Sequence, residues 1–516
     1  MTSLKDLFSH ARNWRLRDLL SLRLLLIILW LPLLRWGELT TFSSSVVRCD
    51  WGTWEKWPSG AAPHRVVLVA DPQLVDPHTY PGRPWPLSSL TVKYTDLYLR
   101  KGFGLIMEQL QPDSVFFLGD LFDGGREWSP PDLERDPRIE RRWRKYGQKL
   151  WMREYRRFGE LFTDQFFASR QAVQTQGRFV ASLPGNHDLG LGKGIRIPVR
   201  ERFYAYFGEG NRIDIVGNYS FIGIDSVSLS AKGQPDPATG VTADTESGNT
   251  IWESTEQFLR EASSIKSQAV ARYLRTQNGG PENDPLDTAV YGLEDPRARD
   301  IRPATHVDAD VPSILLTHIP LYRSAGTPCG PLRERHPPSK LLTGAAEEKD
   351  DANALLLQTG NQYQNVLTAP VSDEIIDLVP DIVHVFSGDD HDYCDVLHRQ
   401  YTSRGGGIRE ITVKSISWAM GIRKPGFLML SLWNPLDAEG KAITTETVSP
   451  RKPTLQTHLC LLPDQLGIFV KYAWMFAITV VALLVRSVRA VKARPVIKGT
   501  AGLGLGGLGV GGALCH

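Results

Sequence analysis

Five short apolar runs in this chain each end in polar residues that could bind a metal ion or transfer a proton. The runs cover residues 66–69, 115–118, 179–183, 314–316 and 382–386. The polar segments that end them are Asp71-Pro72-Gln73, Gly119-Asp120, Gly185-Asn186-His187-Asp188, Thr317-His318 and Gly388-Asp389-Asp390-His391-Asp392. Carboxylate, amide and imidazole groups without a thiolate cluster suit hard or borderline divalent metals. The sequence therefore predicts a metal site where these segments meet.

The chemistry that such a site favours is hydrolysis of a phosphate ester. Two divalent ions a few ångström apart can clamp a phosphoryl group and hold a hydroxide in line for attack. Taken singly, an aspartate after a strand is usually a turn residue, and so is an isolated Asn-His pair. Five such segments, each at the end of an apolar run, favour one shared metal site that hydrolyses a phosphate ester over five unrelated turns.

The elements that must position these residues follow from the pattern of the apolar runs. The runs have strand length and are rich in β-branched or aromatic residues, and a sixth run covers 221–224. Helical patterns lie between several of them, around 97–110 and 139–167. Strands alternating with helices predict an α/β layered fold, in which ligands bind at the carboxyl ends of the strands. Two stretches, about 230–300 and 326–351, are predicted to be loops or insertions.

Two apolar segments flank the region that carries the motifs. The first covers about 19–36 and follows a basic N-terminus at 1–18. We expect a signal anchor there rather than a cleaved signal peptide, because no small-residue cleavage site follows it. The second covers about 466–485 and precedes a basic, Gly-rich tail at 486–516. Because basic flanks stay in the cytoplasm, both termini are expected there, with residues 46–462 in the lumen.

Charge and cysteine content narrow the function classes further. The formal net charge of +2 argues against nucleic acid as the main partner. The basic residues between Arg126 and Arg157 predict a solvated helix face. None of the five cysteines forms a CxxC pair, which argues against a zinc ribbon or a thioredoxin-like site. Four of them lie between the apolar segments, where one or two disulfides and unpaired buried thiols are both open.

The ordered motifs resemble those of the calcineurin-like metallophosphoesterase superfamily, which run D-x-H, GD-x-x-D, GNH-[DE], a lone His and GH-x-H. The resemblance covers about residues 65–392. The segments 70–73, 118–126 and 386–394 are more similar to the branch that removes ethanolamine phosphate from mannose on glycosylphosphatidylinositol (GPI) anchors. This resemblance implies a four-layer α/β/β/α sandwich of mixed sheets, flanked by N- and C-terminal transmembrane helices.

The resemblance also implies a role for each metal ligand. Asp71 and His391 should bind the first metal, and Asp120 should bridge the two metals. Asn186 and His318 should bind the second metal.

Two further ligands depart from the superfamily pattern. Gln73 replaces the histidine of D-x-H, and Asp389 replaces the first histidine of GH-x-H. Both side chains can still coordinate through oxygen. The change from nitrogen to oxygen favours manganese or magnesium over zinc, and the branch itself implies two Mn²⁺ ions.

Other residues are expected to act on the substrate. The resemblance implies that His187 protonates the leaving alkoxide while Asp123 holds and charges its ring, the alternative being a structural histidine in a turn. Arg323 could contact a phosphate oxygen, although a surface arginine is the commoner explanation. Tyr322 and Tyr393 could stack on sugar, although aromatic residues near a sheet edge more often pack.

The resulting hypothesis is a membrane-embedded phosphodiesterase. It would remove ethanolamine phosphate from mannose of a GPI-anchor glycolipid or a GPI-anchored protein, by direct attack of a metal-bound hydroxide. This remodelling is linked to export from the endoplasmic reticulum, so we expect the protein in that membrane, with the Golgi as the alternative location. The cargo-export machinery is then a candidate partner. Asn218-Tyr219-Ser220 is a glycosylation sequon if this region is lumenal.

Two other functions stay open. The first is a generic lumenal phosphoesterase that acts on soluble esters. The second is a non-catalytic trafficking or scaffold protein on the same fold. Only the two departures from the motifs, Gln73 and Asp389, support it.

Overall fold

The computed structural model describes two compact units of the chain. The described residues are 21–492 except for 131–145, 233–250, 280–308, 335–352, 402–406, 444–452, 170, 172, 173, 176, 310, 361, 362 and 438. One unit is Trp36–Gln465, and the other combines the residues up to Arg35 with those from Leu466. The basic N-terminus, most of the Gly-rich tail and parts of both predicted insertions lie outside the described residues.

The smaller unit consists of two helices, α3 (Leu22–Arg35) and α15 (Gln465–Lys492). They pack side by side, with Trp30 Nε1 donating to Thr479 Oγ1 at 3.0 Å. Among the described residues, one helical stretch, Gln465–Arg489, is long and apolar enough to cross a membrane. The helix α3 has 14 residues. The first expected membrane span is therefore not confirmed.

The larger unit contains two mixed β-sheets. The first has the strand order β13-β12-β1-β2-β3, and the second β10-β11-β9-β6-β5-β4. The first sheet is formed by β1 (His64–Val69), β2 (Ser114–Phe117), β3 (Phe179–Val180), β12 (Gly426–Leu432) and β13 (Leu455–Leu461). The second is formed by β4 (Arg212–Val216), β5 (Tyr219–Ile224), β6 (Ser313–Thr317), β9 (Ile382–Ser387), β10 (Cys394–His398) and β11 (Ile408–Thr412). A small third sheet pairs β7 (Thr359–Gly360) with β8 (Tyr363–Gln364).

The strands that carry the motifs run parallel within each sheet. In the first sheet β1, β2 and β3 are parallel, and in the second β5, β6, β9 and β11 are parallel. All six predicted strands are confirmed. Parallel neighbours place the residues that follow them at one edge of the sheet, so the topology itself gathers the polar segments.

The hydrophobic core lies between the two sheets. Alternate residues of each strand point inward, such as Val66 and Leu68 from β1 and Ile314 and Leu316 from β6. The rings of Phe116 and Phe221 stack across the interface with centroids 4.6 Å apart. The predicted mixed α/β fold with two facing sheets is therefore confirmed.

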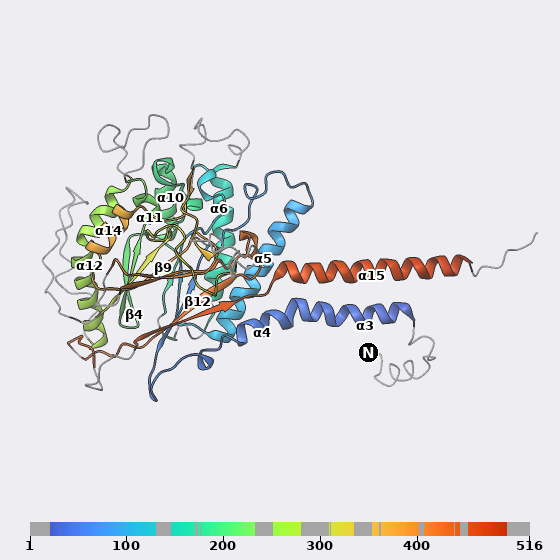
Figure 1. The fold of residues 1–516 in the computed structure, drawn as a ribbon, viewed down its shortest axis with the longest axis horizontal. Coiled ribbons are helices and arrows are strands. Elements are labelled where there is room, and N and C mark those ends of the chain that lie inside the picture. Colours follow the sequence, from blue (N-terminus) through green and yellow to red (C-terminus); the bar gives the residue numbers. More distant parts are fainter. Residues whose placement is uncertain are drawn as a thin grey trace, which may run out of the picture. The chain divides into compact units, whose positions relative to one another are not determined.

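Helices cover both outer faces of this pair of sheets (Figure 1). The first sheet is covered by α5 (Leu87–Leu105), η3 (Ile106–Leu110), α6 (Gly147–Phe158), η6 (Gly159–Thr163) and α7 (Asp164–Phe167). The ring of Phe117 in β2 packs against Phe103, Phe158 and Phe162 from these helices. The second sheet is covered by α11 (Ser226–Leu229), α12 (Glu253–Gln277) and α14 (Ala369–Leu378).

The remaining helices are short and lie mostly in the loops. They are η1 (Trp36–Thr40), α4 (Thr41–Val47), η2 (Trp51–Thr53), η4 (Gly125–Glu127), α9 (Asn186–Leu189), η7 (Gly192–Gly194), α10 (Ile197–Phe207) and η10 (Trp418–Met420). The stretch 230–300 was predicted to be a loop or insertion, but α12 occupies 25 of its residues. The helix has an apolar face, including Leu259 and Val270, that packs on the second sheet. The abundance of Gly, Pro, Ser and Thr around it concealed this face in the sequence.

Four cysteines of the larger unit form two disulfides. Cys49, which follows α4, is bonded to Cys460 in β13, 411 residues away. Cys329 is bonded to Cys394 at the start of β10. The disulfide alternative is therefore the one that the structure favours over unpaired thiols.

Candidate metal centre

The predicted metal ligands come together at the carboxyl ends of the parallel strands. His318, which follows β6, lies at their centre and is fully buried. Its Nε2 is 3.1 Å from Asn186 Oδ1, 3.5 Å from Asp120 Oδ1 and 3.5 Å from Asp389 Oδ1. Four of the five polar segments, which follow β2, β3, β6 and β9, thus meet around one nitrogen atom.

Asp71, after β1, brings the fifth segment to the same place. One ligand atom from each of Asp71, Asp120 and His318 lies within 4.8 Å of the other two. Asp71 Oδ2 is buried and has no hydrogen-bond partner among the described residues. Burial raises the pKa of Asp71 well above its ordinary value. A buried carboxylate oxygen without a partner is costly unless a cation neutralises it, so these residues fit a divalent metal ion.

The backbone around the site is held in a rarely populated conformation. Five of the eight described non-glycine residues with positive φ are predicted ligands. Their φ angles are 47° at Asp71, 33° at Gln73, 52° at Asp120, 70° at Asp389 and 66° at His391. Such angles cost of order 1–3 kcal/mol each and cluster where function fixes a side chain. This independent observation supports the ligand assignment.

Two motif glycines allow the loops to approach this closely. A Cβ at Gly119, where φ is 93°, would lie 2.5 Å from His318 Nδ1. A Cβ at Gly185 would lie 2.0 Å from Asp120 Oδ1. Any side chain at either position would therefore push apart two ligand-bearing loops.

Hydrogen bonding fixes the tautomer of the central histidine. His318 Nδ1 lies 2.8 Å from Leu118 O, and a carbonyl oxygen only accepts, so Nδ1 carries the hydrogen. Nε2 is then the nitrogen that is available to a metal. Burial opposes protonation of the ring, but the nearby carboxylates raise the pKa of His318 well above its ordinary value. The carboxylates around His318 thus favour a positive charge beside them, which a metal ion would supply.

The two departures from the superfamily pattern occupy different positions in the cluster. Gln73 Nε2 donates to Asp120 Oδ2 at 2.6 Å, which leaves Oε1 as the only side-chain atom that could coordinate. Asp389 contacts the other end of the cluster, with its Oδ1 3.5 Å from His318 Nε2. Burial lowers the pKa of His391, while the charges of Asp120 and Asp389 oppose this change. His391 is therefore held in the neutral form that metal binding requires.

The predicted acid pair lies beside the metal ligands. His187 Nδ1 donates to the backbone oxygen of Asp123 at 2.7 Å and lies 3.4 Å from its Oδ1. The ring is one quarter exposed, whereas Asp123 is buried. The backbone N–H of His187 donates to Asp120 Oδ1 at 2.8 Å. The carbonyl assigns the hydrogen to Nδ1, so Nε2 is the nitrogen that can exchange a proton with a substrate.

Two residues with roles here were not predicted from the sequence. Asp188 accepts backbone hydrogen bonds from Leu121, Phe122 and Gly185 at 2.9–3.1 Å, and so joins two motif loops. Burial, with the charge of Asp120, raises the pKa of Asp188 to about 7. Asp188 lies three residues after Gly185, the residue that precedes α9. This is the spacing of a helix-capping residue, and it could have identified Asp188 in the sequence.

The second residue is His78, which contacts the carboxylate of Asp123. Its Nδ1 is 3.8 Å from Asp123 Oδ2, and its Nε2 is 3.6 Å from Glu127 Oε1. Burial would raise the pKa of Asp123, but the neighbouring rings of His78 and His187 lower it. No motif in the sequence indicated that His78 reaches the site. It belongs to a turn in which Asp76 Oδ1 accepts the backbone N–H of His78.

The predicted substrate contacts are mostly structural. Arg323 is buried rather than at the surface, with Nη2 2.7 Å from Glu410 Oε2, so its guanidinium is directed at that carboxylate. Tyr393 is buried in the core between the sheets, and Tyr322 packs on the cluster around the Cys329–Cys394 disulfide. The arginine is thus held by a buried ion pair, and the two tyrosines pack in hydrophobic clusters.

Residues 131–145 of the basic stretch lie outside the described residues, and two arginines at its ends are not on a solvated helix face. Arg126 lies in η4, where its Nη1 donates to Asn186 O at 2.8 Å and its side chain is largely buried. Arg157, in α6, is held by Asp96 at 2.6 Å. Both arginines are therefore part of the scaffold around the site.

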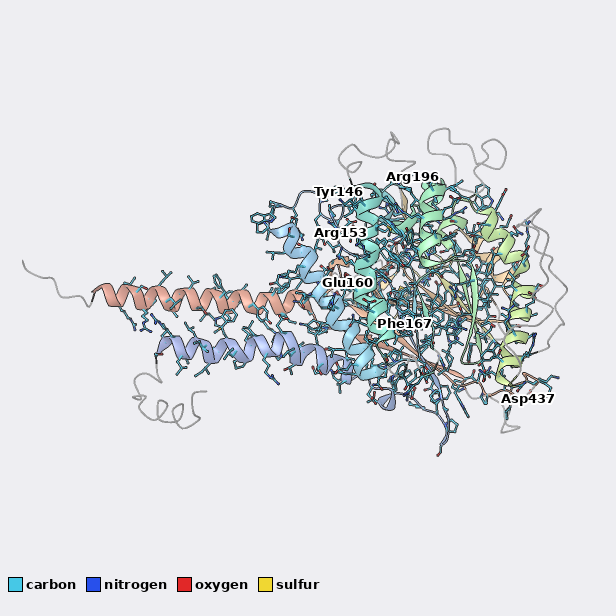
Figure 2. All side chains as sticks on the ribbon, turned by 180° about the vertical axis from the view of Figure 1, so that it is seen from behind. Tyr146, Arg153, Glu160, Phe167, Arg196 and Asp437 are labelled. Atoms are coloured by element: carbon cyan, nitrogen blue, oxygen red, sulfur yellow. A yellow bond between two sulfur atoms is a disulfide. The ribbon has the colours of Figure 1, made fainter. Side chains whose placement is uncertain are left out.

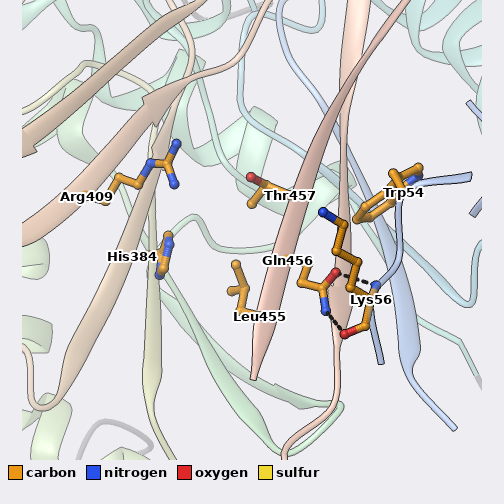
Figure 3. Close-up of a pocket in the computed structure, with 7 residues that line it drawn as sticks. All are labelled: Trp54, Lys56, His384, Arg409, Leu455, Gln456 and Thr457. Carbon is orange, nitrogen blue, oxygen red and sulfur yellow. Dashed lines mark hydrogen bonds between the residues drawn. The ribbon is translucent and has the colours of Figure 1, made fainter. Parts of the chain in front are cut away.

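Two pockets lie in the larger unit away from the predicted ligands. One of about 650 Å³ is lined by Asp76, Tyr80 and Ser88, and by Tyr146 and Arg153, which Figure 2 labels. One of its lining residues, Asp76, accepts the backbone N–H of His78, whose ring lies 3.8 Å from Asp123 Oδ2. The other, of about 360 Å³, is shown in Figure 3 and is lined by Trp54, Lys56, His384, Arg409, Leu455, Gln456 and Thr457. None of the predicted ligands lines either pocket.

Known proteins resemble the chain over most of its length. It is 33% identical to cell division control protein 1 of Saccharomyces cerevisiae over 450 residues, which cover 87% of this chain and 70% of that protein. It is 24% identical to metallophosphoesterase 1 of Ailuropoda melanoleuca over 451 residues, 86% of this chain and 84% of that protein. A dimetal phosphatase from Danio rerio aligns with 72% of this chain and 94% of its own, at 12% identity and a TM-score of 0.29. No family model matches the chain.

Proposed function

The chain belongs to the calcineurin-like metallophosphoesterases, alongside cell division control protein 1 and metallophosphoesterase 1, and we propose on this premise that it removes ethanolamine phosphate from mannose of GPI anchors. The resemblance seen in the motifs is confirmed, and the chain is a phosphoric ester hydrolase. The observation that carries the proposal is the convergence of five strand-end segments on His318 and Asp71.

Two divalent metal ions would be held by the seven predicted ligands. They are Asp71, Gln73, Asp120, Asn186, His318, Asp389 and His391. When bound, the ions polarise the phosphoryl oxygens and make the attacking water more acidic. Because oxygen donors outnumber the two imidazoles, we propose manganese rather than zinc.

The residues of the chain itself supply the proton that the leaving group needs. Mannose leaves as an alkoxide, which is a strong base and must be protonated as the P–O bond breaks. His187 Nδ1 is held by the Asp123 carbonyl. The protonated ring therefore donates its Nε2 proton to the oxygen of the leaving mannose. The buried Asp123 carboxylate, 3.4 Å from Nδ1, stabilises the charged ring before transfer. Asp123 and His187 together therefore form the acid.

The proposed location is the membrane of the endoplasmic reticulum, with the catalytic unit in the lumen. The two disulfides suit an oxidising compartment. The helix α15 suits membrane anchoring, with a basic segment after it that favours the cytoplasm. Asn218 would then be available to the glycosylation machinery, although its Nδ2 donates to Asn434 O at 2.6 Å in the folded chain.

The test of the substrate is an analysis of GPI anchors in cells whose only copy carries Asp120→Asn. These cells should accumulate anchors that keep an extra ethanolamine phosphate, because Asp120 contacts both Gln73 and His187 in the cluster. Asp437→Asn makes the same chemical change in an exposed loop and should leave the anchor profile normal. An unchanged profile in the Asp120→Asn cells would reject the substrate assignment.

Metal analysis separates the enzyme from a scaffold protein on the same fold. The purified full-length chain should contain about two equivalents of manganese and hydrolyse a soluble phosphodiester. A folded, metal-free and inactive chain would favour the scaffold. Activity on soluble esters together with a normal anchor profile in the Asp120→Asn cells would favour the generic phosphoesterase.

A further inference from the structure

The first half of α5 presents a row of exposed apolar side chains. Leu87, Leu90, Tyr94 and Leu97 are 55%, 42%, 43% and 46% exposed. Their spacing of three and four residues places them on one face of the helix. Trp85, just before the helix, is 81% exposed. These five residues, called here the α5 stripe, would normally face a protein core.

The second half of α5 is fixed to both points where the larger unit joins the apolar helices. Tyr98 Oη donates to Pro463 O at 2.9 Å, two residues before α15 begins at Gln465. Lys101 Nζ binds Glu38 Oε2 at 2.8 Å, three residues after α3 ends at Arg35. The helix that carries the stripe is therefore anchored at the places where the chain passes into its most apolar segments.

More apolar surface lies on the segments packed around α5 at these points. Leu39 in η1, Val47 in α4 and Leu461 in β13 are all exposed. The helix α4 packs against α5 and against β13. A soluble protein rarely exposes so many large apolar side chains in one region unless something covers them.

We propose that the α5 stripe inserts into the surface of a phospholipid bilayer, with Trp85 in the headgroup layer. Aromatic residues favour that layer, and an amphipathic helix buries its apolar face at the boundary between headgroups and acyl chains. The exposed Lys93 and Arg100 of the same helix can keep their charges among the headgroups. The inference rests on the proposed membrane anchoring of the chain.

The opposite face of α5 explains what this insertion does. Ser88 and Val92 line the pocket of about 650 Å³, which Asp76 also lines. Asp76 bonds the backbone of His78, whose ring lies 3.8 Å from Asp123 Oδ2. One helix thus contacts lipid on one face and, on the other, lines a pocket whose residue Asp76 holds the histidine beside Asp123. The arrangement selects substrates that are themselves held in the membrane.

The direct test is photo-crosslinking in the full-length chain. The photoreactive residue p-benzoylphenylalanine replaces Leu90 in one variant and Leu397, a slightly more exposed leucine of β10, in the other. Both are placed in nanodiscs of phosphatidylcholine with phosphatidylserine. Lipid adducts should form at position 90 and be absent at position 397. No adduct at 90, or equal adducts at both positions, would overturn the proposal.

A second measurement reads out the consequence for activity. The triple variant Leu90→Gln, Tyr94→Gln, Leu97→Gln should lose roughly tenfold in kcat/KM on a lipid-linked phosphodiester in proteoliposomes, because it removes three apolar contacts with the bilayer. Its activity on soluble bis(p-nitrophenyl) phosphate should be unchanged, which also shows that it is folded. Equal loss on both substrates would mean that the residues only stabilise the fold and would overturn the proposal.

The matched control changes three residues of the same types and similar exposure elsewhere on the unit. Leu357→Gln, Tyr363→Gln, Leu397→Gln should keep both activities. If the normal chain does not hydrolyse the lipid-linked ester, the proposed function fails, but crosslinking at position 90 still decides whether α5 meets the bilayer.

Discussion

Replacing His187 by alanine tests whether its ring is an acid or part of the metal site. The ring contacts Asp123, whereas the bond to Asp120 comes from the backbone N–H of His187, at 2.8 Å. Truncation of the side chain leaves that backbone bond in place. We therefore expect His187→Ala to retain its metal while turnover falls by about 10²–10⁴, the usual contribution of a general acid.

Comparing substrates with different leaving groups provides a second test of the acid role. An alkoxide needs the proton, whereas p-nitrophenolate is a weak base and leaves without it. The loss in kcat should therefore be large for an alkyl diester and small for a p-nitrophenyl diester. Metal content is measured on the same purified samples. Equal losses of metal and turnover, or equal losses with both leaving groups, would refute the acid role.

Asp123→Asn provides the graded comparison. The closest contact of His187 Nδ1 is the backbone oxygen of Asp123, at 2.7 Å, and this contact survives the change. Of its contacts with His187, the change removes only the charge at 3.4 Å. We expect a loss of about tenfold, smaller than for His187→Ala, with the same dependence on the leaving group. A larger loss than for His187→Ala would mean that the carboxylate acts in another way.

Three further predictions follow from particular contacts. Asn186→Ala should lose metal and turnover together, since Asn186 Oδ1 faces His318 Nε2 at 3.1 Å; retention of two metal equivalents by elemental analysis would contradict the ligand role. Glu410→Gln should lower the free energy of unfolding by about 3–5 kcal/mol and the melting temperature accordingly, because it leaves Arg323 as an unpaired buried charge; an unchanged melting temperature would argue against that ion pair. Burial, and then the charge of Asp123, raises the pKa of Asp76 to about 7, so the folded state binds this proton more tightly than the unfolded state and loses stability as pH rises towards 7. Asp76→Asn should therefore gain stability relative to the normal chain, by about 2.6 kcal/mol between pH 5 and pH 8, and a constant difference in melting temperature would refute the assignment.

The sequence predicted those parts of the site that depend on local order along the chain. Strand ends are marked by the change from apolar to polar residues, and parallel pairing gathers those ends, so Asp71, Asp120 and His318 were found together. The two-sheet α/β fold followed from the same strands. These features need only short-range patterns and one topological rule.

The features that the sequence did not predict depend on contacts between distant segments. Arg323 follows a strand like the ligands do, but Glu410, 87 residues away, pairs with it and removes it from the site. His78 has no motif and reaches Asp123 only because the turn at Asp76 folds back. The helix α12 was concealed by its surroundings, and the disulfide pairing required the three-dimensional structure.

The Cys49–Cys460 disulfide makes the larger unit a covalently closed ring of chain. Its two cysteines are 411 residues apart and stand near the two ends of the unit. A single cut by a protease anywhere between them would therefore leave one particle, whose two pieces separate on a gel only after reduction. Each apolar helix would also remain linked to the whole of the catalytic unit after such a cut. If α15 anchors the chain as proposed, a nicked enzyme would stay on the membrane with the segments of the candidate metal site still joined.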